Sequence, residues 1–75
     1  MIFLNAPIQQ EQIIALLDGY NQDGVTFKYV KKEAPMKLLF ETNQTDLEAA
    51  VKVAKATIKA QSWGAVLFFQ AGVVQ

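Results

Sequence analysis

Six short segments of alternating strand and helix character divide this chain of 75 residues. Runs rich in β-branched and aromatic residues favour strands. They alternate with segments whose apolar residues recur at helical spacing. The chain therefore predicts the order β-α-β-β-α-β. We expect strands at residues 2–5, 25–32, 37–42 and 65–71, and helices that open near Pro7 and Thr45.

Both expected helices carry start and stop signals. Pro7 suits a first helical position, with Asn5 or Ala6 as the cap, because proline lacks the N–H that would be unpaired there. Thr45, followed three residues later by an acid, fits a capping box. Gly64 is a candidate stop for the second helix. The second helix also places apolar residues on one stripe, namely Leu47, Ala50, Val51, Ala54 and Ile58.

The element order predicts a specific topology. Right-handed crossovers around a central hairpin produce a ferredoxin-like βαββαβ two-layer sandwich. Its antiparallel sheet has the strand order 4-1-3-2, with two helices on one face. A different small α+β sandwich with another strand order is the alternative. Residues 1–75 are expected to form one α+β domain, as is typical of this length.

The expected strands hold more apolar residues than one sheet face needs. Side chains alternate between the two faces of a strand. We assign one set to the helix-covered face: Ile2, Leu4, Phe27, Tyr29, Leu38, Phe40, Leu67 and Phe69. The open face then carries a second apolar set, which is the candidate interface: Phe3, Val30, Leu39, Val66 and Phe68.

An exposed apolar patch of this kind usually marks an interface. The sequence therefore predicts association through the open sheet face, as a homodimer. A different protein partner and a small apolar ligand in the interface are alternatives. Residues 71–75 folding over the same face would be a third explanation.

The composition restricts the chemistry. Histidine, cysteine and arginine are absent, and seven lysines balance seven acids. The commonest general base, the thiolate nucleophile and the bidentate phosphate fork are thus missing. We therefore expect no catalytic residue, cofactor or metal site, and no nucleic-acid partner. The chain shows no signal peptide or membrane span, so we expect a cytoplasmic protein without a membrane partner.

These observations favour a small non-enzymatic interaction or regulatory domain. One alternative is a regulatory domain that binds a small ligand at a dimer interface or a strand–helix loop. A less favoured alternative is an enzyme that uses Lys, Asp or Glu. Two groups of lysines have simpler roles: edge protection on the central hairpin and a solvated stripe on the second helix. The helix stripe consists of Lys52, Lys55 and Lys59.

Overall fold

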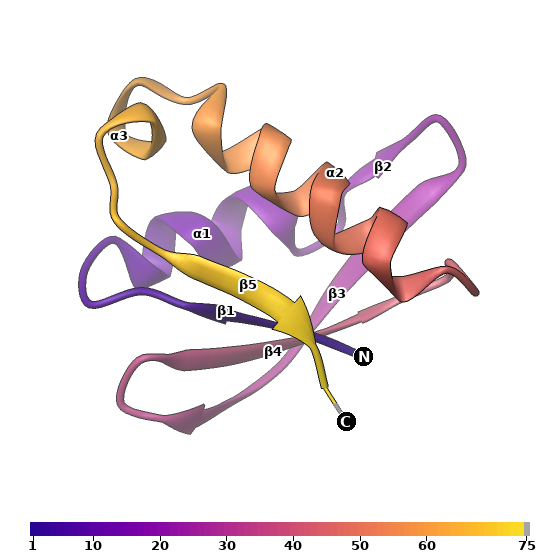
Figure 1. Ribbon diagram of the computed structural model, residues 1–75, viewed down its shortest axis with the longest axis horizontal. Helices are drawn as coiled ribbons and strands as arrows, with labels where there is room; N and C mark the ends of the chain where they lie inside the picture. The colour runs from indigo at the N-terminus through magenta and orange to yellow at the C-terminus, as the bar shows by residue number, and fades with distance from the viewer. Residues whose placement is uncertain (75) are drawn as a thin grey trace.

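The structure, a computed structural model, describes residues 1–74 and has two layers (Figure 1). A five-stranded antiparallel sheet has the order β2-β3-β4-β1-β5. The helices lie over one of its faces. The elements are β1 (Ile2–Asn5), α1 (Gln10–Leu17), β2 (Asn21–Gln22), β3 (Val25–Ala34), β4 (Lys37–Thr42), α2 (Leu47–Lys59), α3 (Ser62–Ala65) and β5 (Gln70–Val73).

The α+β class is confirmed, but two elements were not predicted. One is α3, and the other is the two-residue strand β2 at the sheet edge. A turn at Asp23 and Gly24, both with positive φ (55° and 78°), joins β2 to β3. Asp-Gly in a two-residue hairpin of this kind is a recognised sequence signal. The residues before this turn are polar, however, and the sequence pattern therefore predicts a loop there and no strand.

Helix α1 begins later than predicted. It starts at Gln10 rather than at Pro7. The Ala6 N–H donates to the Met36 carbonyl at 2.9 Å. The Gln10 side-chain amide donates to the carbonyls of Ala6 and Pro35, both at 2.8 Å. These bonds tie residues 6–9 to the β3–β4 turn, so this segment is a connection and not a first helical turn.

The predicted apolar stripe of α2 is confirmed, whereas both predicted ends are wrong. Ala50, Val51, Ala54 and Ile58 are buried. The N-cap is Asp46, whose carboxylate accepts from the Ala49 N–H at 3.2 Å. The helix ends at Lys59, and Gly64 lies inside α3 instead of stopping α2.

Replacement of the cap tests this assignment. Asp46→Ala is expected to lower the free energy of unfolding by about 1 kcal/mol, because an N–H of the first turn loses its acceptor. Thr45→Ala, at the neighbouring exposed residue, is the control and should change it by less than about 0.5 kcal/mol. Urea denaturation followed by circular dichroism measures both. Equal losses would contradict the Asp46 cap.

The last strand also differs from the prediction. It covers Gln70–Val73 and not residues 65–71, because its pairing with β1 begins at Asn5 opposite Gln70. Residues form a strand only where a neighbouring strand pairs with them. Because β1 ends at Asn5, the residues before Gln70 have no strand to pair with. Val66 and Phe68 therefore lie outside the sheet. Residues 71–73 form the edge of the sheet and do not fold over its open face; residue 75 lies outside the described residues.

The core lies between the helices and the sheet. The helix-facing strand residues predicted from alternation are buried at five positions, namely Ile2, Leu4, Phe27, Leu38 and Phe40. Tyr29, Leu67 and Phe69 are partly buried and pack against this cluster. The predicted helix-covered face is therefore confirmed for β1, β3 and β4, whereas Leu67 and Phe69 pack against the core from the segment before β5, outside the sheet. Within residues 1–74, no helix has the length and apolarity that crossing a membrane would require.

Candidate interaction surfaces

The open sheet face brings together two of the five predicted interface residues. Strand register places Phe3 of β1 directly between Leu39 of β4 and Gly72 of β5. Lys31 of β3 continues this row beyond Leu39. Leu39 is only 3% exposed and Phe3 is partly buried, so neither is fully open to solvent.

Two neighbours cover the Phe3 ring. A Cβ added to Gly72 would lie 2.8 Å from Phe3 Cε2, so the ring packs directly on the glycine backbone. The Lys37 ammonium lies 5.1 Å from the ring centroid, within cation–π range. The same ammonium pairs with the Glu33 carboxylate at 3.2 Å. The centre of the open face therefore exposes less apolar surface than the sequence predicts.

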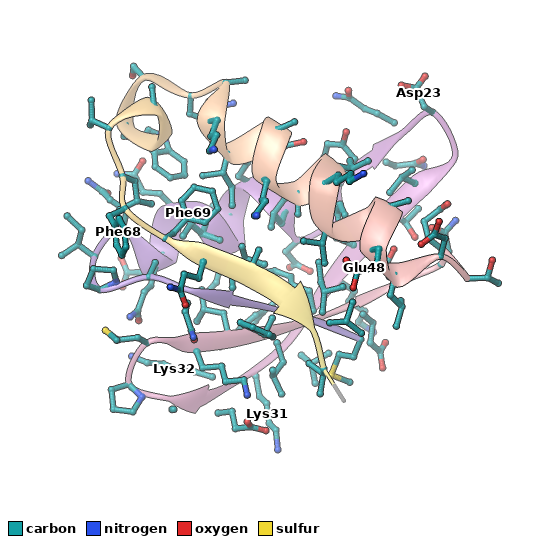
Figure 2. All side chains as sticks on the ribbon, in the orientation of Figure 1. Asp23, Lys31, Lys32, Glu48, Phe68 and Phe69 are labelled. Carbon is teal, nitrogen blue, oxygen red and sulfur yellow. The ribbon has the colours of Figure 1, made fainter. Side chains whose placement is uncertain are left out.

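The other three predicted interface residues lie apart from this row. Val30 is 39% exposed and sits where the β3–β4 register shifts, between Tyr29 and Lys31. Val66 follows α3 and is 87% exposed. Phe68 precedes β5, is 78% exposed and points away from the core (Figure 2).

Phe68 borders an apolar pocket at one end of the open face. The pocket measures about 240 Å³ and is lined by Asn5, Pro7, Met36, Phe68 and Gln70. Asn5 and Gln70 pair across β1 and β5, and alternation with buried Leu4 places them on the open face.

Three apolar residues line this pocket, namely Pro7, Met36 and Phe68, and we call them the end patch. Met36 is 48% exposed. Ile8, next to Pro7, is 62% exposed and lines a neighbouring hollow at the β1–α1 connection. Sequence reasoning did not place Pro7 and Met36 at this surface. The signal that could have found them is that each lies in a connection that contains a proline, Pro7 or Pro35.

The two largest of the described hollows are more open and more polar. One, of about 490 Å³, lies at the β1–α1 connection and includes Gln9, Gln10 and Lys32 in its lining. The other, of about 500 Å³, lies between the end of α2 and the segment from Leu16 to Gln22. The side chains of residues 1–74 include no buried polar or charged group and no cluster of three metal-binding residues. No protein-family model, curated protein or solved structure matches this chain.

Proposed function

We propose that this chain is a small non-enzymatic interaction domain that associates with a second copy of itself through the end patch. This proposal rests on the exposure of the Phe68 side chain. The core is complete without this ring, which stands 78% exposed beside an apolar pocket. Burial of such a ring contributes roughly 1.5–3 kcal/mol.

Two features favour a second copy as the partner. The chain has no net charge, so long-range repulsion does not oppose self-association. A twofold interface is self-complementary. It would place Phe68 of each copy against the Met36 side of the other, with the neighbouring Phe3 and Leu39 row at its border. A different protein is the alternative partner. A small ligand in the hollow at the β1–α1 connection, which is a strand–helix loop, is the second candidate.

We also propose that the domain is a ferredoxin-like sandwich with additions. The four longer strands lie in the order β5-β1-β4-β3. Counted along the chain without β2, these are strands 4, 1, 3 and 2. On this proposal, β2 and α3 are insertions that leave the sandwich topology unchanged. The fold by itself assigns no function.

Substitution of Phe68 tests the association. At high micromolar concentration, size-exclusion chromatography with light scattering is expected to give the mass of a dimer. Phe68→Asp should give a monomer, because a charge cannot be buried unpaired in an apolar contact. Val66→Asp is the matched control, at a residue that is 87% exposed and outside the end patch, and it should remain dimeric. A monomeric parent chain, or a dimeric Phe68→Asp, would refute the proposal.

A further inference from the structure

Strand β5 is the unprotected edge of the sheet. It ends the strand order, and its residues Gln70–Val73 include no charge and no proline. The opposite side is protected differently. There the two-residue strand β2 pairs only with Val25 and Thr26 of β3. Beyond this pairing β3 carries Lys28, Lys31 and Lys32 and has two register shifts against β4; Lys31 and Lys32 are labelled in Figure 2. Lysines and bulges discourage a further strand from pairing, so only the β5 edge is open to one.

The free hydrogen-bonding groups of β5 follow from its pairing with β1. The Val74 N–H donates to the Met1 carbonyl at 3.0 Å. In an antiparallel ladder, hydrogen-bonded pairs alternate with pairs that are not bonded to each other. Gly72 and Gln70 are therefore bonded to β1. The N–H and C=O groups of Ala71 and Val73 point away from it, toward the open edge.

A row of positive charge accompanies this edge. Helix α2 packs against β5 (Figure 1). Thr57 and Ala60 line a hollow shared with the segment after α1, so their flank of α2 faces α1. The opposite flank of α2 therefore faces the β5 edge. Helical spacing places the lysine stripe of Lys52, Lys55 and Lys59 on this flank. All three lysines are exposed, and the one acid with them, Glu48, lies at the start of α2 (Figure 2).

We infer that the β5 edge binds an extended acidic segment of another protein as an added strand. The main chain of that segment would pair with the peptide groups of Ala71 and Val73, as in β-augmentation. Side chains of an added strand alternate between the faces. One set meets the lysine stripe and is acidic. The other set lies beside Gly72 and the Phe3 ring and is apolar.

Charge selects this partner over a second copy. If two β5 edges paired, the two lysine stripes would approach each other, and like charges across an interface oppose association. An acidic strand meets the opposite charge. The peptide groups of this site, those of Ala71 and Val73, are not part of the end patch, and the inference does not rest on self-association.

A peptide of alternating residues tests the charge requirement. The probe is a fluorescein-labelled, end-blocked hexapeptide with the repeat Glu-Val, and binding is followed by anisotropy. A Lys-Val hexapeptide is expected to bind at least about tenfold more weakly. The double variant Lys52→Glu with Lys55→Glu should weaken Glu-Val binding by about tenfold or more. The control double variant, Lys28→Glu with Lys31→Glu, changes the net charge by the same amount but on β3, on the other side of the sheet. It should change the affinity for the Glu-Val peptide by no more than about twofold.

The position of the added strand needs a second readout. On addition of the Glu-Val peptide, amide hydrogen exchange at Ala71 and Val73 should slow, because these N–H groups gain acceptors. Ala71→Pro removes one of these donors at an edge position that accepts proline, and it should abolish binding, whereas Ala71→Ser keeps the donor and the binding. Phe68→Ser, which removes the ring of the end patch without adding a charge, should bind the peptide normally, which separates this site from the end patch.

Four outcomes would overturn the inference. The Glu-Val peptide does not bind, or it binds no better than the Lys-Val peptide. It binds without slowing exchange at Ala71 and Val73, which would mean charge attraction without an added strand. Exchange at these amides slows when the protein alone is concentrated, which would make a second copy the occupant.

Discussion

Phe40→Ala is expected to lower the free energy of unfolding by about 3–5 kcal/mol. Phe40 is fully buried at the centre of β4, and its ring lies 5.5 Å from the Tyr29 ring. Truncation removes the transfer free energy of the ring and leaves a cavity that the surrounding strands fill only in part. Domains of this size have about 5–15 kcal/mol of stability in total, so the variant is expected to be close to unfolding.

Urea denaturation, followed by circular dichroism and by the fluorescence of the single tryptophan, measures this loss. Phe68→Ala is the matched control, because it removes the same ring from a position that is 78% exposed. It should change the free energy of unfolding of the monomer by no more than about 0.5 kcal/mol. Similar losses for the two variants would contradict the placement of the core.

The second large effect is expected at Gly64, which lies inside α3 and is buried. A Cβ at this residue would overlap the carbonyl oxygen of Ile58 and lie 2.7 Å from its carbonyl carbon. Because these are backbone atoms at the end of α2, no rotamer change relieves the overlap. Gly64→Ala is therefore expected to lower the free energy of unfolding by about 3 kcal/mol or more, at the upper end of overpacking effects.

Gly19→Ala is the control for this prediction. Gly19 has a φ of 82° and no atom within 4 Å of an added Cβ, so alanine meets backbone strain there but no overlap. This strain costs roughly 1–2 kcal/mol. The denaturant midpoints of the two variants show whether the steric overlap at Gly64 costs more stability than the backbone strain at Gly19. A smaller loss at Gly64 than at Gly19 would show that α3 does not press on α2 as described.

The helix-covered face of the sheet is predictable from local periodicity. Alternation along β1 selects Ile2 and Leu4, and alternation along β4 selects Leu38 and Phe40. All four are fully buried. This works because a pleated strand directs successive side chains to opposite faces, whatever its neighbours are.

The candidate interface is only partly predictable. Phe3 and Leu39 lie side by side on the open face, as alternation predicts. Their exposure was overestimated, because the glycine opposite Phe3 becomes known only from strand register. Val66 and Phe68 were expected on a strand, and they lie before it. Phe68 belongs to the end patch because it lines the same pocket as Met36, which is distant in the sequence.

The sequence by itself determined the class of the domain, the order of its main strands and helices, and most residues of the core, because pleat and helix geometry act within a few residues. Tertiary structure decided where α1 begins, where β5 begins and which edge of the sheet is free. Each of these depends on hydrogen bonds between distant segments, such as Ala6 with Met36 and Val74 with Met1. Partners of that kind are chosen by the packing of the whole chain, and no local pattern encodes them.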